Sequence, residues 1–197
     1  QNDKSTYPLF GDAGTATAIE YNLNCETLKF QIGVDGNRSN AIVVPDGGFR
    51  NPFSSNSFKS KTFNGGIIRS PKDLILEGMD VFSFGITMAP KSVNSLLEKY
   101  NIDRESVDYY LFHQANLFMN EKIRKKLKIS EDKVPYSLYQ FGNTSSATIP
   151  LTMITQKSNE LKNASKSIIA CGFGVGLSWG SVWFKSSNLV CSKLIEI

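Results

Sequence analysis

The chain has 197 residues, of which 41% are hydrophobic and 20% are charged, and its formal net charge is +4. This is the composition of an ordinary globular protein that is large enough to bury a core. The charge is too small for a typical nucleic-acid-binding domain, and no apolar run approaches the roughly 18 residues that span a membrane. We therefore expect neither nucleic acid nor a membrane as a partner.

The three cysteines, Cys25, Cys171 and Cys191, are odd in number and far apart in the sequence. This spacing argues against both a disulfide framework and a cysteine-based metal site. The first residues lack the charged and then apolar order of a signal peptide. We therefore expect a cytoplasmic protein without a bound metal. The start at Gln1 rather than at methionine indicates processing or truncation.

The first 70 residues predict short strands and one long connection. Strands are expected at residues 7–10 and 15–21, with a turn between them, and a third at residues 28–34. From residue 45 to residue 70, proline, glycine, serine and asparagine prevail, which predicts a long surface loop with a short hairpin at most. This loop is either a solvated connection or a lid or interface loop.

Helices and strands alternate in the rest of the chain. A helix is expected to begin near Glu77, and Pro90 is expected to kink it or to start a new helix that reaches Tyr100. The elements that follow are a strand at 109–112, a basic helix up to residue 128, a strand at 134–137, a helix over 149–161, and strands at 167–171 and 177–184. This alternation predicts an α/β fold.

Two polar residues stand where predicted strands end. His113, the only histidine, directly follows the strand at 109–112. It is either a core histidine or a catalytic group, because ligands of open α/β sheets bind beyond the carboxyl ends of strands. Asn143, at a second strand-to-helix junction, is either a turn residue or a hydrogen-bond donor. With Nε2 protonated, His113 and the Asn143 amide can both donate to a developing oxyanion.

Two further segments have both a structural and a functional interpretation. The glycine-rich residues 172–176 lack the spacing of a phosphate-binding loop and precede a strand. They form either a tight hairpin or a loop whose main-chain N–H approaches a reacting carbonyl. The basic helix, with its cations between residues 122 and 128, is either a solvated face or a surface for a phosphate or an acidic carrier protein.

Together, five segments resemble the β-ketoacyl–acyl carrier protein synthase III family, which has a thiolase-like fold. They follow the family's order over nearly the whole chain: Phe10-Gly11-Asp12-Ala13-Gly14, Gly78-Met79-Asp80-Val81-Phe82, Phe112-His113-Gln114-Ala115-Asn116, Phe141-Gly142-Asn143-Thr144-Ser145 and Gly172-Phe173-Gly174-Val175-Gly176-Leu177-Ser178-Trp179-Gly180. The resemblance implies that residues 25–197 are the C-terminal half of this fold, a mixed five-stranded sheet flanked by helices. It also implies that residues 1–24 are the closing hairpin of an otherwise absent N-terminal half.

The family joins an acyl group to malonyl–acyl carrier protein by decarboxylative Claisen condensation in fatty acid biosynthesis. Its cysteine takes the acyl group from acyl-coenzyme A, and its histidine and asparagine bind the malonyl thioester. His113 and Asn143 match the latter two residues. Coenzyme A and phosphopantetheine thioesters are thus implied as substrates, with no cofactor. Other residues are implied to orient the pantetheine arm or His113, to line the acyl pocket and to supply an oxyanion-hole N–H: Asn116, Phe82, Phe173, Gly174 and Val175.

None of the three cysteines stands where the family has its nucleophile, which precedes the first hairpin. The chain is therefore expected to be a fragment that lacks the cysteine of a Cys-His-Asn triad and does not catalyse condensation alone. Such a half would expose the face that normally packs on the other half, so we expect poor solubility or self-association. The resemblance also implies a homodimer.

Two departures from the family concern substrate recognition. Met79 replaces a common coenzyme A-contacting asparagine, and Phe118 replaces a common carrier-binding arginine. Carrier binding is then expected at Arg124, Lys125 and Lys126. Two alternatives stay open: a synthase III-like acyltransferase with a different acceptor, and a non-catalytic partner subunit.

Overall fold

The computed structural model describes residue 3 and residues 5–196. Its centre is a mixed four-stranded sheet in the order β1-β8-β7-β6, in which β6 and β7 are parallel and the other pairs antiparallel. Two two-stranded ribbons, β2–β5 and β3–β4, lie outside it. The strands are β1 (Lys29–Val34), β2 (Ile42–Val43), β3 (Lys61–Phe63), β4 (Ile67–Arg69), β5 (Ile75–Leu76), β6 (Tyr109–Phe112), β7 (Lys166–Gly174) and β8 (Ser178–Ser186).

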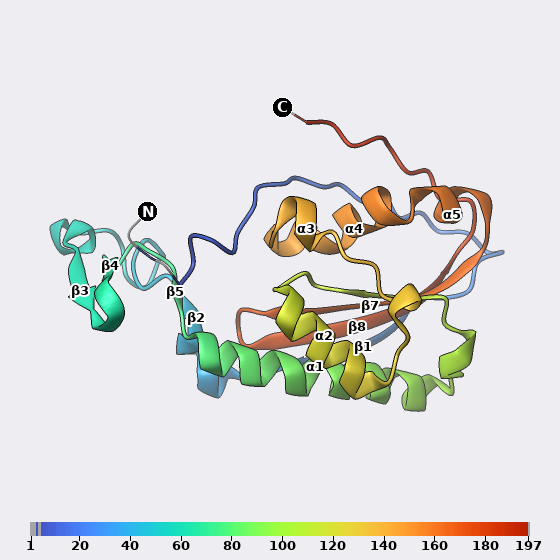
Figure 1. Cartoon of the computed structure of the whole chain (residues 1–197), viewed down its shortest axis with the longest axis horizontal. Coiled ribbons are helices and arrows are strands. Elements are labelled where there is room, and N and C mark those ends of the chain that lie inside the picture. The colour runs from blue at the N-terminus through green and yellow to red at the C-terminus, as the bar shows by residue number, and fades with distance from the viewer. Residues whose placement is uncertain (1–2, 4, 197) are drawn as a thin grey trace.

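Helices cover both faces of the sheet (Figure 1). On one face lie α1 (Gly78–Tyr100) and α2 (Leu117–Leu127), and on the other lie α3 (Leu138–Phe141), α4 (Thr148–Gln156) and α5 (Ser158–Asn163). Successive residues of β6 point to opposite faces. Phe112 accordingly joins the larger core under α1, whereas Leu111 joins the smaller core under α4 and α5. The predicted α/β class is confirmed.

None of the helices in the described part of the chain combines the length and the apolarity that crossing a membrane requires.

The strand predicted at residues 134–137 is wrong, and so is the five-stranded count. The segment lies between a 3-10 turn (Glu131–Lys133) and α3, and it belongs to none of the described sheets. Pro135, in its middle, has no N–H to donate to a neighbouring strand. The described central sheet therefore has four strands.

The hairpin predicted near the start of the chain does not form either. Residues 5–9 are a turn, residues 11–22 run extended without a partner strand, and a single bridge joins Phe10 to Asn143. A strand needs neighbouring backbone groups for its hydrogen bonds, and this segment leaves side chains such as Ile19 and Tyr21 exposed to solvent. Residues 1, 2 and 4 of the expected hairpin domain lie outside the described residues.

Helix α1 runs unbroken through Pro90, where the sequence predicted a kink or a new helix. Proline removes the N–H that would bond the carbonyl four residues earlier, which here belongs to Ile86. The Lys126 ammonium of α2 donates to that carbonyl at 3.2 Å. A contact from another helix thus satisfies the group that proline leaves unpaired.

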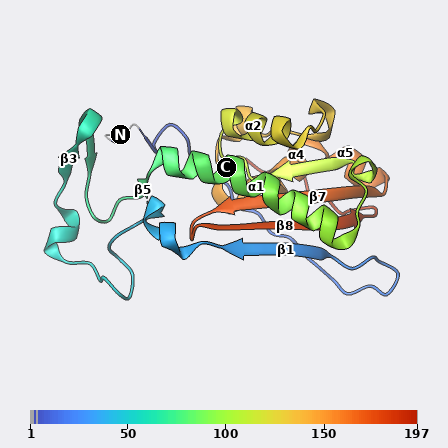
Figure 2. The ribbon, with the colours of Figure 1, turned by 90° about the horizontal axis from the view of Figure 1, so that it is seen from below.

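Residues 42–76 form an arm that projects from one side of the sheet (Figures 1 and 2).

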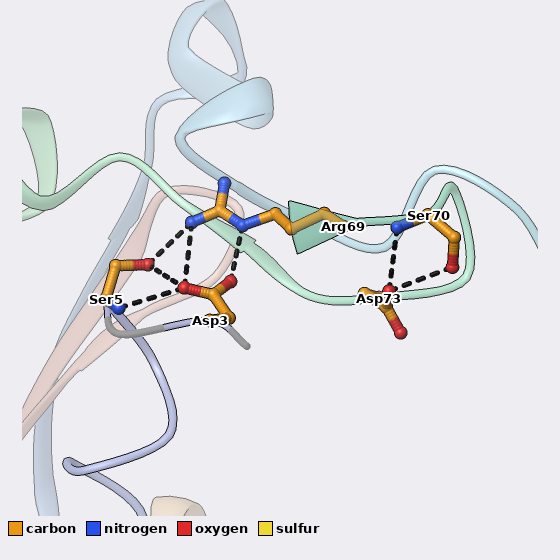
Figure 3. Close-up of polar contacts among 5 residues, drawn as sticks. All are labelled: Asp3, Ser5, Arg69, Ser70 and Asp73. Atoms are coloured by element: carbon orange, nitrogen blue, oxygen red, sulfur yellow. Dashed lines mark hydrogen bonds and ion pairs between the residues drawn. The ribbon is translucent and has the colours of Figure 1, made fainter. Parts of the chain in front are cut away.

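Arg69, at the end of β4, donates to the Asp3 carboxylate and, at 2.6 Å, to the Ser5 hydroxyl (Figure 3). This guanidinium holds the pKa of Asp3 well below its usual range. Nearby, Asp73 accepts from the backbone and the hydroxyl of Ser70 (Figure 3). The predicted loop with a short hairpin is confirmed by the pairing of β3 with β4. The bonds from Arg69 connect Asp3 and Ser5 of the N-terminal segment to the end of β4.

One face of β1 is apolar and exposed. Gln31 pairs with Ser181, whose hydroxyl lies 2.7 Å from that of Ser92 on α1, so this side of the strand faces the helix. Alternate residues of a strand point to opposite faces. The residues on the far face are Phe30, Ile32 and Val34, with exposed fractions of 46%, 74% and 71%.

We expect the chain to self-associate through this face of β1. An edge strand offers unpaired backbone groups, and the exposed apolar side chains add a hydrophobic driving force. Size-exclusion chromatography with light scattering should show dimers or larger species for the wild type. Ile32→Lys should shift the population towards monomer. A wild-type chain that stays monomeric at every concentration tested would contradict this expectation.

Candidate active site

A cavity of about 1170 Å³ opens where β6 and β7 end. Most of its wall is apolar, and a few polar side chains converge in it, as in typical small-molecule sites. Seven residues that the sequence nominated line it together: His113, Asn143, Asn116, Phe82, Phe173, Gly174 and Val175. The cavity therefore unites residues from α1, β7, the segment that follows β6 and the loop before α4.

His113 is the first residue beyond β6 and is fixed on several sides. Its backbone N–H donates to the Cys171 carbonyl at 2.8 Å, which extends the parallel ladder by one residue. Its own carbonyl accepts from the Asn120 side chain at 3.2 Å. The imidazole meets the Phe173 ring edge-on at 5.6 Å, and Nδ1 lies 2.9 Å from the Thr148 hydroxyl. The ring position is thus determined by packing and hydrogen bonds, while the ring also lines the cavity.

The orientation of the Asn143 amide is set by the backbone. Oδ1 of Asn143 accepts from the Ser145 N–H at 2.9 Å. An amide side chain has one acceptor oxygen and one donor nitrogen. Because the oxygen is engaged, Nδ2 is the group that Asn143 offers to a molecule in the cavity.

Residues 9–11 clamp the Asn143 loop from outside. The Asn143 N–H donates to the Leu9 carbonyl at 2.9 Å, and the Gly11 N–H donates to the Asn143 carbonyl at 3.0 Å. Glycine is required at both contacts: Gly142 has a φ of +60°, and a Cβ on Gly11 would lie 2.1 Å from the Phe141 carbonyl oxygen. Sequence analysis missed this clamp, which depends on segments far apart in the chain.

Ser145 connects the two polar side chains of the site. Its N–H holds Asn143, and its carbonyl accepts from the Thr148 hydroxyl at 2.9 Å, the same hydroxyl that contacts His113. The φ of Ser145 is +55°, in the left-handed region that costs a non-glycine residue energy. Neither Ser145 nor Thr148 was singled out from the sequence. The only available signal was the run of small polar residues after Asn143.

Asn116 and Phe82 line the cavity and also make structural contacts. Oδ1 of Asn116 accepts from the Met119 N–H at 2.8 Å as the N-cap of α2. Phe82 stacks on Phe118, with ring centroids 5.5 Å apart and planes at 13°. The Lys122 ammonium lies 5.3 Å from the centre of the Phe118 ring. Both rings of this pair line the cavity, and a cation lies over one of them.

Arg124, for which carrier binding stays a prediction, has partners inside the protein. Arg124 is 7% exposed and donates to both carboxylate oxygens of Glu121, at 2.8 and 2.7 Å, and to the Ile129 carbonyl at 2.9 Å. Its guanidinium is therefore paired with groups of the protein itself. Lys126 is engaged with the Ile86 carbonyl. Lys125, with a side chain 68% exposed and 3.9 Å from Glu121, is the member of the predicted trio that faces solvent most freely.

The protonation states follow from burial. Burial lowers the pKa of His113 to about 4, so the ring is neutral at pH 7. Burial raises the pKa of the Cys171 thiol to about 12, which leaves it a protonated, unreactive thiol. No cysteine lines the cavity within the described residues, nor does that part of the chain contain a cluster of metal-binding side chains. The cavity can therefore stabilise charge on a bound carbonyl.

We expect His113 to reduce stability between pH 6.5 and pH 4. The unfolded chain takes up a proton near pH 6.5, whereas folded His113 does so only near pH 4. The unfolding free energy therefore falls as the pH is lowered through this window and then levels off, by up to about 3 kcal/mol. Denaturant titrations at several pH values check this. His113→Gln should lack this fall, and equal pH slopes in both proteins would contradict the prediction.

The architecture defines the class of protein. The mixed sheet between helical layers, with its cavity at the strand ends, is that of thiolase-like proteins. Residues 97–186 match the family model described as 3-oxoacyl-[acyl-carrier-protein (ACP)] synthase III C terminal. The chain belongs to this synthase III family, and it corresponds to the C-terminal part of the fold.

Individual relatives agree with this assignment. The chain is 32% identical over 183 residues to a beta-ketoacyl-[acyl-carrier-protein] synthase III from Lactococcus lactis, a match that covers 91% of this chain and 53% of the relative. A crystal structure of a 3-oxoacyl-(acyl-carrier-protein) synthase III superposes with a TM-score of 0.83 at 33% identity, covering 95% of this chain and 56% of that one. The Burkholderia xenovorans LB400 enzyme gives 0.74 at 35%, covering 84% and 46%. The chain thus spans about half the length of the curated relatives it matches.

Proposed function

We propose that this chain supplies the carbanion-stabilising half of a 3-oxoacyl–acyl carrier protein synthase III. The observation that carries this proposal is the pairing of His113 with Asn143 on one cavity, where the bond from the Ser145 N–H to Oδ1 leaves Nδ2 as the donor of Asn143. As the malonyl thioester loses carbon dioxide, its electron pair passes into an enolate whose oxygen bears the charge. Hydrogen bonds aimed at that oxygen lower the barrier. The enolate carbon then attacks an acyl-cysteine thioester and expels the cysteine thiolate.

The cysteine is proposed to come from a first half of the fold. Within the described chain no cysteine reaches the cavity, and Ile32 of the exposed β1 face is part of the cavity wall. A partner element seated on that face would bury apolar surface and would bring its own side chains to His113 and Asn143. The single chain is therefore proposed to be inactive in condensation.

Acyl-coenzyme A and malonyl–acyl carrier protein are the proposed substrates, with no further cofactor. Phe82 and Phe173 are proposed to contact the acyl chain, and Asn116 the pantetheine arm. The loop at Gly174 and Val175 is proposed to offer a main-chain N–H to the acyl carbonyl. Lys125, whose ammonium lies 3.9 Å from the Glu121 carboxylate and whose side chain is 68% exposed, is proposed to contact the acidic carrier. The family resemblance also supports a cytoplasmic homodimer.

A chimaera tests the proposal. The part of the Lactococcus lactis relative that precedes the matched stretch is fused ahead of this chain. Carbon dioxide release from malonyl–acyl carrier protein and formation of the 3-oxoacyl product are then measured. We expect the chimaera to perform both steps and the single chain to form no condensation product. A folded chimaera that performs neither step would refute the proposal.

A different acceptor is the second candidate. It is favoured by the Phe82–Phe118 stack, which places an aromatic pair where a carrier-binding cation is common. In this case the chimaera takes an acyl group from acyl-coenzyme A but does not decarboxylate the malonyl carrier. Amine and alcohol acceptors, supplied to the acylated chimaera, would then release the acyl group.

A further inference from the structure

Asn120 is a polar residue at a position of α2 that faces the core. It shares the helical spacing of Ile123 and Leu127, which are both buried in the larger core. Asn120 itself is 0% exposed. Its N–H makes the ordinary helical bond to the Asn116 carbonyl, so helix formation does not require an amide side chain here. An apolar residue is the usual occupant of such a position.

The two ends of the Asn120 amide have different surroundings. Nδ2 donates to the His113 carbonyl at 3.2 Å. Oδ1 is buried and accepts from no group in the part of the chain that the structure describes. An unpaired buried acceptor lowers the stability of the folded state. The bond to His113 is therefore the contact that distinguishes asparagine from an apolar residue at this position.

The His113 carbonyl does not depend on Asn120 for a hydrogen bond. The Ala115 N–H also donates to it, at 3.0 Å, and closes a γ-turn at Gln114. One donor is enough to keep a buried carbonyl from being unpaired. Because a carbonyl oxygen has two lone pairs, the second donor restrains the direction of the carbonyl. Asn120 thus contributes orientation rather than stability.

The direction of this carbonyl influences where the His113 side chain points. The His113 N–H, which donates to the Cys171 carbonyl at 2.8 Å, fixes the peptide plane before Cα. The His113 carbonyl, held by Asn120 and Ala115, fixes the plane after Cα. Because peptide units are planar, these two planes together determine the direction of the Cα–Cβ bond.

We propose that Asn120 is a positioning residue that holds the peptide plane after His113 and thereby directs the imidazole into the cavity. The imidazole also contacts Phe173 and Thr148, so removal of the Asn120 donor displaces the ring without releasing it. A displacement of about 1 Å can lower an enzymatic rate by up to about 10²-fold. The effect of Asn120 on catalysis rests on the proposed function, whereas its effect on the ring position does not.

Asn120→Leu tests the proposal in the single chain. Leucine keeps the branched shape of asparagine but has neither a donor nor an acceptor. We expect the variant to unfold at a denaturant concentration equal to or above that of the wild type, because the unpaired acceptor is gone.

NMR of the same chain reports the ring position. Because His113 is the only histidine, a tag-free chain labelled with ¹³C-histidine shows a single imidazole. Its C–H resonances, which the adjacent Phe173 ring shifts, should move in Asn120→Leu and in Asn120→Ala, which both lack the donor. Ile123→Val, one turn further along the same face of α2, is the control and should leave them in place.

In the chimaera, Asn120→Leu should lower kcat for decarboxylation about tenfold and change KM for the malonyl carrier by less than about twofold. A buried residue that contacts no substrate affects the chemical step through His113 and leaves carrier binding intact. The loss is smaller than that expected for removal of the imidazole, because the ring is displaced and still present.

Three results would overturn the proposal. One is a denaturant midpoint of Asn120→Leu clearly below that of the wild type, which would mean that the amide serves stability. Another is a set of unchanged imidazole resonances in folded Asn120→Leu and Asn120→Ala chains. The third is an Asn120→Leu chimaera that decarboxylates as fast as an active unsubstituted chimaera. An inactive unsubstituted chimaera, together with the expected NMR shifts, would count against the proposed function alone.

Discussion

In the chimaera, His113→Ala and Asn143→Ala are each expected to lower the rate of malonyl–carrier decarboxylation by about 10²–10³-fold. Both side chains line the cavity and are held by the Ser145–Thr148 segment. Removing either one deprives the enolate oxygen of a partner at the point where charge develops. The rate is measured as carbon dioxide release under single-turnover conditions, which separates chemistry from carrier binding.

Matched variants sharpen this test. Asn143→Asp keeps the oxygen that accepts from Ser145 but replaces the Nδ2 donor by an oxygen, so its loss should equal that of Asn143→Ala. Asn159→Ala, on the exposed surface of α5, is the control and should leave the rate unchanged. An unaltered rate for His113→Ala would support the alternative that the chain is a non-catalytic partner subunit.

Arg124→Ala is expected to lower the unfolding free energy by about 2–3 kcal/mol. The substitution leaves Glu121 without its two bonds to the guanidinium and removes the donor from the Ile129 carbonyl. Partial exposure of Glu121 keeps the loss below that of a fully buried pair. Denaturant unfolding of the single chain measures it. Lys125→Ala, one residue along the same helix, should change the unfolding free energy by less than about 0.5 kcal/mol.

The acid dependence of the same variant provides a second check. Hydrogen bonding from Arg124 lowers the pKa of Glu121 to about 2. Stabilisation by this pair is therefore complete above the unfolded pKa, near 4.5, and is lost as the pH falls towards 2. Arg124→Ala should flatten that part of the stability curve. A small effect equal to that of Lys125→Ala, with no change in acid sensitivity, would contradict this prediction. Arg124 would then be available for carrier binding, as the sequence led us to expect.

The sequence alone determined the elements with strong local signals and the residues next to them. The buried run at 109–112 predicted β6 with its exact bounds, and this placed His113 at a strand end. Leu28–Val34 predicted β1 to within one residue at its start. The prediction at Val134–Ser137 failed because Pro135 has no N–H with which to join the ladder of a neighbouring strand. Patterns of apolar residues report burial, and they do not report which backbone groups find partners.

Only the tertiary structure decided how the site is held and which charges are free. The clamp by Leu9 and Gly11, the Lys126 bond that compensates for Pro90 and the engagement of Arg124 by Glu121 are formed by packing. His113 and Asn143 are linked through Thr148 and Ser145 by hydrogen bonds that form only in the folded chain. Hydrogen bonds act over about 3 Å, so chemistry that depends on them is determined by the positions of atoms in the folded chain. The candidate residues themselves could be predicted from their positions in the sequence.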